Sequence, residues 1–353
     1  MLEKNTLDLM KDLTQEIGVS GSEKGISKVL QGYYKNLCDE IIFDNLGSVF
    51  AIKKSEIENA KKVMICSHMD ELGFMVKEIK DNGLIRVLVL GNIPLKEVIN
   101  KRVSIVNKNG ELVEGVISLI KSSKNREMDN LYIDIGAESK EEVINYKIDI
   151  GNQIIINGEF KELLDGKRIV SKAWDDRFGC VLGIEILREL KDVKLDFDLY
   201  VGCSVQNLVG LRGSITSTNL IKPDLAIVTD CLEANDIKNT DDQTGKLGDG
   251  LLVSYYDKSM MPNKLLLKEL INICDRENIK YQYYYSMDES DGGWIHKLLN
   301  GCPTLKLSIC ARNLKSNSAI IDARDYLSSK EALKSVLKEL NIEKIEFFKT
   351  ENR

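Results

Sequence analysis

The chain has 353 residues and a formal net charge of −6, with 49 Lys and Arg against 55 Asp and Glu. This length exceeds the size at which single hydrophobic cores stop growing, so it predicts one large domain and a smaller one. The modest, interspersed charge argues against nucleic acid or an anionic membrane as a partner.

The opening residues are charged, and no apolar run approaches the length of a membrane span. We therefore expect neither a signal sequence nor a membrane segment, and a cytoplasmic location. The eight cysteines form no C-x-x-C pair, and most lie in apolar runs. This pattern indicates buried, reduced thiols rather than a disulfide framework or a zinc ribbon.

Helical periodicity predicts helices over residues 5–17 and 26–37. Strands are expected over 40–43, over 48–52 and in the apolar run that ends at His68. Between about residues 75 and 165 the pattern changes to short strands separated by turn residues such as Asn-Gly, which is typical of a small barrel or sandwich.

After residue 169, helices and strands alternate again. The expected helices are 179–190, 263–277 and 329–340, and the expected strands are 196–204, 225–229 and 304–309. The economical interpretation is an α/β domain of residues 1–74 and 166–353, interrupted by an inserted β-domain of residues 75–165.

His68 is one of only two histidines, and it follows the apolar run Val63-Met64-Ile65-Cys66-Ser67. Side chains alternate along a strand, so His68 and Asp70 are expected on one face, where an imidazole and a carboxylate suit Zn²⁺ or Co²⁺. A histidine that merely caps a strand end is the alternative.

Two further segments place carboxylates beside predicted elements. Asp175 and Asp176 lie at a strand-to-helix transition, where one can cap the helix while the other faces a metal. A capping Asp with a surface ion pair is the simpler alternative. Asp230 ends an apolar strand, and the carboxyl ends of strands in open α/β sheets form the crevice that binds ligands.

Five segments, residues 67–74, 131–137, 172–179, 209–213 and 301–304, follow one another in an order that resembles a known family. They are similar to the tetrahedral-particle metallo-aminopeptidases, the glutamyl and deblocking enzymes that use two co-catalytic metal ions. The resemblance implies a mixed-sheet, zinc-aminopeptidase-like α/β domain with an inserted small β-domain. Fold alone does not settle function.

The resemblance assigns roles residue by residue. His68, Asp175 and Asp230 match the ligands of one metal position, and Asp175 matches the carboxylate that bridges both metals. Asp70 matches the aspartate that orients the metal-bound histidine. Asp291 and Arg312 fall in segments that resemble the substrate pocket. The second histidine, His296, lies on a helical segment and is expected on the surface.

Three other positions depart from the family pattern. Asn207 stands where the family has its general base, a glutamate. Leu208 and Lys315 stand where the family has a glutamate and a histidine that are unique to the other metal. A leucine cannot coordinate a metal, and an ammonium has no lone pair. The second metal is therefore expected to be absent.

These losses predict that peptidase activity is lost or strongly impaired, with at most one Zn²⁺ or Co²⁺ per chain and a pocket for peptide or amino-acid ends. Two alternatives stay open. The first is an active single-metal aminopeptidase or amidohydrolase with Asp70, Asp176 or Asp291 as a substitute base. The second is an inactive structural subunit of an oligomer.

Two further expectations concern charge and assembly. We expect the Lys315 ammonium to replace the second metal beside Asp175, the alternative being a solvent-facing lysine. The resemblance also implies a homo-oligomer assembled through the inserted domain. A dimer is preferred over a dodecamer, because residues 122–125 and the segment after Gly91-Asn92 depart from the family pattern.

Overall fold

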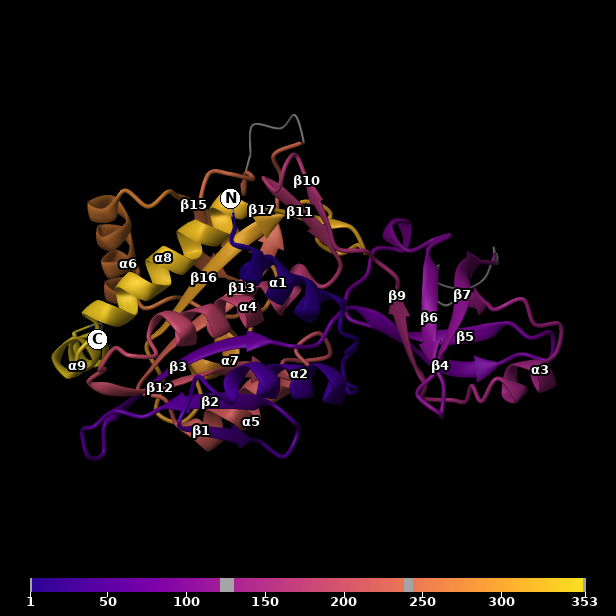
Figure 1. Cartoon of the computed structure of the whole chain (residues 1–353), viewed down its shortest axis with the longest axis horizontal. Helices are drawn as coiled ribbons and strands as arrows, with labels where there is room; N and C mark the ends of the chain where they lie inside the picture. The colour runs from indigo at the N-terminus through magenta and orange to yellow at the C-terminus, as the bar shows by residue number, and fades with distance from the viewer. Residues whose placement is uncertain (1, 121–129, 238–243, 352–353) are drawn as a thin grey trace.

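An eight-stranded mixed sheet forms the centre of the larger part of the molecule (Figure 1). The computed structural model describes residues 2–120, 130–237 and 244–351. Across the sheet the strand order is β1 (Glu40–Phe43), β2 (Val49–Lys53), β12 (Phe197–Ser204), β3 (Lys61–His68), β13 (Leu225–Glu233), β16 (Thr304–Ala311), β14 (Leu251–Asp257) and β15 (Tyr281–Ser286). Strands β12, β3, β13 and β16 are parallel neighbours. Their near-continuous apolar sequences suit a sheet that is buried on both faces.

Helices cover both faces of this sheet. The main core lies under α1 (Lys4–Gln15), α2 (Lys24–Tyr34), α4 (Trp174–Glu189), α6 (Lys264–Glu277), α8 (Ala323–Glu339) and α9 (Ile342–Thr350). On the other face, α5 (Arg212–Ile221) and α7 (Gly292–Ile295) lie over a smaller apolar cluster. Helix α4 is buried on nearly all sides, as is typical of a helix at the centre of a core. No helix within the described ranges combines the length and apolar character that crossing a membrane requires.

Six antiparallel strands close into a barrel that has a core of its own. Around the barrel the order is β4 (Gly73–Ile79), β5 (Ile85–Leu90), β8 (Leu131–Asp134), β7 (Leu112–Leu119), β6 (Arg102–Val106) and β9 (Gln153–Ile156). Gly83 and Gly110 adopt φ values of 82° and 80° at the hairpin tips between β4 and β5 and between β6 and β7. Such turns favour glycine. The expected combination of a mixed α/β sheet and a small barrel is confirmed.

The remaining elements are a small sheet and two short helices. A three-stranded antiparallel sheet consists of β10 (Lys161–Leu163), β11 (Arg168–Ser171) and β17 (Ala319–Asp322). The short helices η1 (Leu95–Glu97) and α3 (Lys140–Asn145) accompany the barrel, which extends from one end of the molecule while α9 lies at the other (Figure 1).

Several elements differ from the sequence prediction. Strand β13 continues to Glu233, so Asp230 lies within the strand rather than at its end. Helix α8 begins at Ala323 rather than at residue 329, because the Asp322 side chain accepts a hydrogen bond from Arg324 N and caps it. Strands β14 and β15 and helices α5 and α9 were not predicted. Residues 122–125 lie outside the described part of the chain, and the proposed domain boundaries at 75 and 165 stay a prediction.

Candidate metal centre

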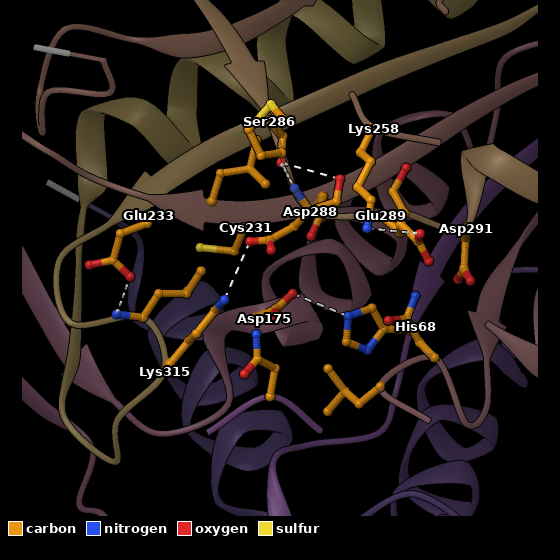
Figure 2. A pocket seen from close by; sticks show the side chains of 18 of the residues that line it. His68, Asp175, Cys231, Glu233, Lys258, Ser286, Asp288, Glu289, Asp291 and Lys315 are labelled. Carbon is orange, nitrogen blue, oxygen red and sulfur yellow. Dashed lines mark hydrogen bonds and ion pairs between the residues drawn. The ribbon is translucent and has the colours of Figure 1, made fainter. Parts of the chain in front are cut away.

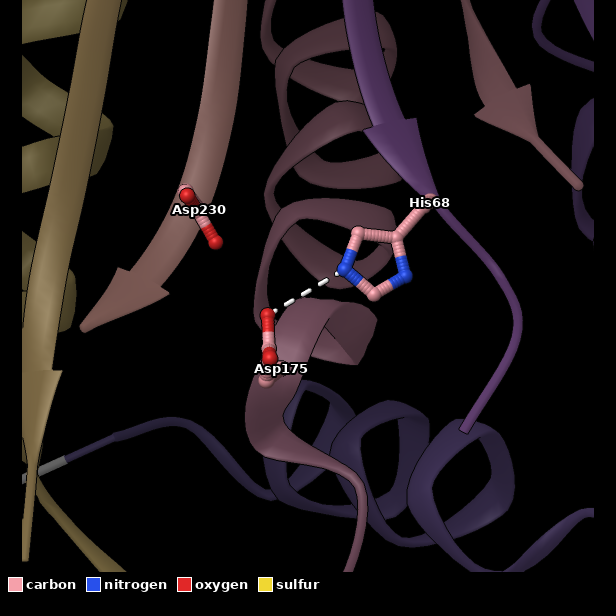
Figure 3. Close-up of side chains that lie close together, drawn as sticks. All are labelled: His68, Asp175 and Asp230. Carbon is pink, nitrogen blue, oxygen red and sulfur yellow. Dashed lines mark hydrogen bonds and ion pairs between the residues drawn. The ribbon is translucent and has the colours of Figure 1, made fainter. Parts of the chain in front are cut away.

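His68, Asp175 and Asp230 bring one nitrogen and two carboxylates together at the carboxyl end of the sheet (Figure 3). Their ligand atoms all lie within 4.8 Å of one another. His68 is the last residue of β3, Asp230 belongs to the neighbouring parallel strand β13, and Asp175 lies in the first turn of α4. His68 Nε2 lies 3.1 Å from Asp175 Oδ1. One nitrogen and two carboxylate oxygens can hold one Zn²⁺ or Co²⁺.

The start of α4 has an irregular backbone that presents Asp175 to the centre. Ala173 has a left-handed conformation with φ of 58°, and both Asp175 and Asp176 depart from helical angles. Asp176 turns away from the pocket and accepts hydrogen bonds from Gly179 N and Thr229 Oγ1, at 3.0 and 2.8 Å. Burial raises the pKa of Asp176 well above its usual range. The two adjacent carboxylates therefore serve different purposes, one facing the site and one fixing the helix.

Asp70 is buried behind His68 and holds its ring in place. His68 Nδ1 lies 3.3 Å from Asp70 Oδ1. The same carboxylate accepts hydrogen bonds from Ser20 Oγ, Asn207 N and Leu208 N, at 2.6, 3.0 and 3.0 Å. Burial acts to raise the pKa of Asp70, but these contacts, led by His68, hold it below the usual value. Asp70 thus stays ionised and ties the histidine to the 207–208 backbone.

Burial and neighbouring charges shift the pKa values of His68 and Asp230. Burial acts to lower the pKa of His68, but hydrogen bonds to Asp175 and Asp70 outweigh it and raise that pKa well above the usual value. Burial raises the pKa of Asp230 to about 7; a lysine, Lys306, acts to lower it, and Asp175 acts to raise it. The clustered carboxylates therefore favour a cation among them.

The centre opens into a pocket with a volume of about 520 Å³ (Figure 2). Acidic side chains outnumber basic ones in its lining; they are Asp175, Asp230, Glu233, Asp288, Glu289 and Asp291. The lysines that line it are Lys258 and Lys315. Lys258 pairs with Glu289 at 3.3 Å. This excess of carboxylates suits a ligand that carries an ammonium group.

Asn207 and Leu208 both line this pocket. The amide of Asn207 is neither an acid nor a base near neutral pH, and Leu208 offers no donor atom. Neither position therefore supplies a carboxylate or an imidazole to the cluster of His68, Asp175 and Asp230. Asp291 also lines the pocket and accepts a hydrogen bond of 2.6 Å from Ser204 Oγ, while burial raises its pKa.

Lys315 differs from the expectation that it would lie beside Asp175. Its Nζ lies 3.4 Å from Asp288 Oδ2, an exposed carboxylate of the pocket, and it is beyond ion-pair distance of Asp175. Figure 2 shows Lys315 and His68 on opposite sides of Asp175 in this view. The preceding residue, Leu314, donates its backbone N–H to Glu233 at 3.2 Å.

Two more expected residues lie away from the centre. Arg312 makes two hydrogen bonds of 2.8 Å to Asp236 and does not belong to the pocket lining. His296 follows α7, and its Nδ1 lies 2.8 Å from Gly292 O, in the lining of a different hollow. Neither residue joins His68, Asp175 and Asp230 in the candidate metal cluster.

Sequence reasoning missed Lys306. This lysine lies in β16, its side chain is fully buried, and its Nζ lies 2.6 Å from Asp230 Oδ2. Asp257 Oδ2 is its second partner, at 3.4 Å. Burial acts to lower the pKa of Lys306, but the two carboxylates outweigh it and raise that pKa. A lysine inside the otherwise apolar run Thr304-Leu305-Lys306-Leu307 was the signal that could have identified it.

Comparisons with known proteins agree with this architecture. The family model described as M42 glutamyl aminopeptidase matches residues 47–331. The glutamyl aminopeptidase of Lactococcus lactis is 31% identical over 347 residues, which cover 96% of this chain and 97% of that protein. The TET aminopeptidase of the marine sediment archaeon Thaumarchaeota archaeon SCGC AB-539-E09 superimposes with a TM-score of 0.93 at 29% identity, covering 98% of this chain and 100% of that one.

A further structure is that of the Pyrococcus horikoshii TET1 peptidase, which can assemble into a tetrahedron or a large octahedral shell. It has a TM-score of 0.83 and 25% identity, and the match covers 95% of this chain and 100% of that chain. The likeness therefore extends over nearly the full length of both chains, the barrel included.

Proposed function

This chain belongs to the M42 glutamyl aminopeptidase family, and we propose that it keeps the family scaffold while its peptidase activity is lost or strongly impaired. The observation that carries the proposal is the identity of the pocket residues at 207 and 208. Asn207 supplies no general base, and Leu208 supplies no metal ligand. General acid–base help is typically worth about 10²–10⁴-fold in rate, so its loss alone removes most of the turnover.

The residues present suit one divalent ion, Zn²⁺ or Co²⁺, held by His68, Asp175 and Asp230. When bound, such an ion supplies Lewis-acid polarisation of a carbonyl oxygen. Asp70 orients the imidazole of His68 through the Nδ1 contact, and this outer hydrogen bond fixes which ring nitrogen faces the site. Within the described residues, His68, Asp175 and Asp230 form the candidate cluster, and Leu208 and Lys315 stand where the resemblance places the ligands of a second ion.

The ligand that we propose is the amino end of a peptide or a free amino acid. The pocket carries more carboxylates than cations, and Asp288, Glu289 and Asp291 lie on the segment that faces His68 and Asp175 (Figure 2). An ammonium group can pair with these carboxylates, and the pocket volume of about 520 Å³ suits a small ligand.

A second candidate is a working single-metal hydrolase in which Asp291 replaces the missing base. Asp291 lies in the pocket, and its pKa is raised by burial, which moves a carboxylate toward the range that suits a general base near neutral pH. Asp70 and Asp176 are less suitable, because their oxygens already accept the hydrogen bonds of buried donors.

We also propose that the protein is a cytoplasmic homo-oligomer, assembled through the barrel. The support is the structural likeness to the TET1 peptidase, which assembles into closed shells. Under this proposal an inactive chain can still serve as a subunit.

Elemental analysis after dialysis against excess Zn²⁺ or Co²⁺ tests the metal assignment. We expect at most one ion per chain, and two tightly bound ions would contradict the proposal. Calorimetry with a dipeptide and with its N-acetylated form tests the ligand class. Binding that disappears on acetylation supports recognition of the amino end, and equal binding of both forms contradicts it.

A further inference from the structure

The ammonium group of Lys306 contacts Asp230 of the candidate metal centre from the interior of the protein. Its side chain has no exposed surface, and it is not among the residues that line the pocket. Strands β16 and β13 run parallel, with Lys306 opposite Val228. The side chain therefore extends along β13 toward the carboxyl end of the sheet, where it contacts Asp230.

The surroundings of Lys306 hold it in the charged form and in one position. A fully buried lysine requires ionic partners, because an unpaired ammonium is costly away from water. Asp230 and Asp257 provide them, at 2.6 and 3.4 Å. Asp257 is itself fixed, because Ser259 N and Oγ donate to its Oδ1 at 2.8 Å each and Ser290 Oγ donates to its Oδ2.

We propose that the Lys306 ammonium is a built-in cation of this centre, which shares Asp230 with any bound divalent ion and weakens the binding of that ion. A divalent ion and an ammonium on the same carboxylate repel each other across a buried, weakly screened distance. An ammonium also occupies one oxygen of Asp230, which leaves this ligand less negative charge to offer a metal.

Lys306, rather than Lys315, supplies a cation to the carboxylates of the candidate centre. A centre built for two divalent ions loses two positive charges when one ion is absent, and clustered buried carboxylates then need another cation. Lys315 is bound to Asp288 at the pocket wall and does not reach Asp175. Lys306 is the lysine that contacts a carboxylate of the candidate centre within the described residues.

This inference rests on the proposed single-metal centre, but its test is independent of peptidase activity. The parent protein and the Lys306→Met variant are stripped of metal and titrated with Zn²⁺ in competition with a chromophoric chelator. We expect the variant to bind Zn²⁺ about tenfold more tightly or better, because the repulsion is gone and Asp230 is released. Equal or weaker binding by the variant would overturn the inference and make Lys306 a group that merely orients Asp230.

Lys315→Met is the matched control, since it removes the same charge from the pocket wall without touching Asp230. Its Zn²⁺ affinity should stay within about threefold of the parent value, given the screening of a partly exposed pair. A gain in affinity for Lys315→Met that equals the gain for Lys306→Met would show a general charge effect and refute the specific role of Lys306.

Removing Lys306 leaves Asp230 and Asp257 buried without their cation, so a second variant guards against misfolding. Lys306→Met combined with Asp257→Asn removes one of the two carboxylates and keeps Asp230 intact. The double variant should again bind Zn²⁺ more tightly than Asp257→Asn alone, and the absence of that gain counts against the inference. Efficient peptidase turnover by the parent protein would defeat the proposed function but would leave these affinity comparisons unaffected.

Discussion

Asp70 connects His68 of the candidate centre to the backbone at residues 207 and 208 through one carboxylate. It contacts His68 Nδ1 and accepts the backbone N–H groups of Asn207 and Leu208. The backbone at 207 and 208 is therefore held at the pocket, at the two positions where the resemblance places glutamates. A residue introduced at either position would start from a fixed backbone and enter the pocket that Asn207 and Leu208 now line.

This geometry leads to a rescue prediction. The combined variant Asn207→Glu, Leu208→Glu and Lys315→His should bind a second divalent ion and show measurable aminopeptidase turnover. Each single substitution should fail to do so, because a base and two ligands act as a unit and their effects are not additive. Metal content and the hydrolysis of aminoacyl chromogenic substrates provide the readouts. Turnover restored by Asn207→Glu alone would show that the second metal is dispensable.

At the scale of residues, the structure brings together some of the side chains that the sequence singled out and separates others. The sequence singled out one histidine and two aspartates because imidazole and carboxylate groups bind metals. The structure places these three side chains together; they are His68, Asp175 and Asp230. The contact of Lys315 differs from the one expected, and Lys306 was overlooked, for the same physical reason. The direction of a long lysine side chain depends on its tertiary neighbours, Asp288 in one case and Asp230 in the other, and sequence spacing contains neither contact.

Helix α4 lies so close to β3 and β13 that one of its glycines leaves no room for a side chain. A Cβ at Gly179 would lie 2.0 Å from Thr229 Oγ1 and 2.7 Å from Ser67 Cβ. Gly32 in α2 is the opposite case, since a Cβ there meets nothing within 4 Å.

The two glycines form a matched pair for unfolding experiments. We expect Gly179→Ala to lower the free energy of unfolding by about 1–3 kcal/mol, the typical cost of overpacking a core. Gly32→Ala should raise it by about 0.5–1 kcal/mol, because alanine is the better helix former. Urea unfolding measures both values, and a neutral Gly179→Ala would mean that α4 can move away from the sheet.

Asp325 in the first turn of α8 should make stability depend on pH. It accepts hydrogen bonds from Gly248 N and Gly250 N, both at 2.8 Å, yet burial raises its pKa to about 7. The folded state then binds the proton more tightly than the unfolded state, whose aspartate titrates near 4. The stability contributed by this group is therefore complete below about pH 4 and is lost as the pH rises toward 7.

Comparison with Asp325→Asn isolates this effect, because the substituted amide does not titrate. Relative to the variant, the parent protein should lose on the order of 3 kcal/mol of unfolding free energy between about pH 4 and pH 8. A difference between the two proteins that stays constant over this range would show that the carboxyl titrates normally in the folded state.

Among the elements, the segments with a clear periodic or apolar pattern were predictable. The elements whose position or bounds depend on tertiary contacts were not. Strand β1 was predicted with its observed bounds, because short β-branched runs bounded by turn residues are informative. Strand β15 at the edge of the sheet was missed, because its sequence YQYYYS does not alternate between apolar and polar residue types, although the burial of its side chains does alternate. Helix α8 begins earlier in the chain than its first clear helical period, because Asp322 caps it.

On the scale of the whole molecule, the barrel offers apolar side chains to solvent. Leu88 on β5 and Leu112 on β7 are 45% and 53% exposed. Apolar side chains are also exposed elsewhere on the molecule, and we propose the two on the barrel as part of an association surface. Strands β5 and β7 lie at the end of the molecule opposite α9 (Figure 1).

We expect mass photometry and light scattering to find a dimer or a larger assembly at micromolar concentration. Leu88→Glu together with Leu112→Glu should shift the population toward the monomer, because charged groups resist burial. Phe347→Glu on α9, where the phenyl ring is also half exposed, is the control and should not change the assembly. A parent protein that is strictly monomeric would refute the role of the barrel.

The central claim is that this member of the family no longer hydrolyses peptides efficiently. Turnover on a panel of acidic, basic and neutral aminoacyl chromogenic substrates, with Zn²⁺ or Co²⁺ in excess, tests it most directly. The proposed loss of the base and of one metal predicts rates at the level of a His68→Ala variant, for every substrate and either metal. Efficient, metal-dependent turnover of any of these substrates that His68→Ala abolishes would contradict it.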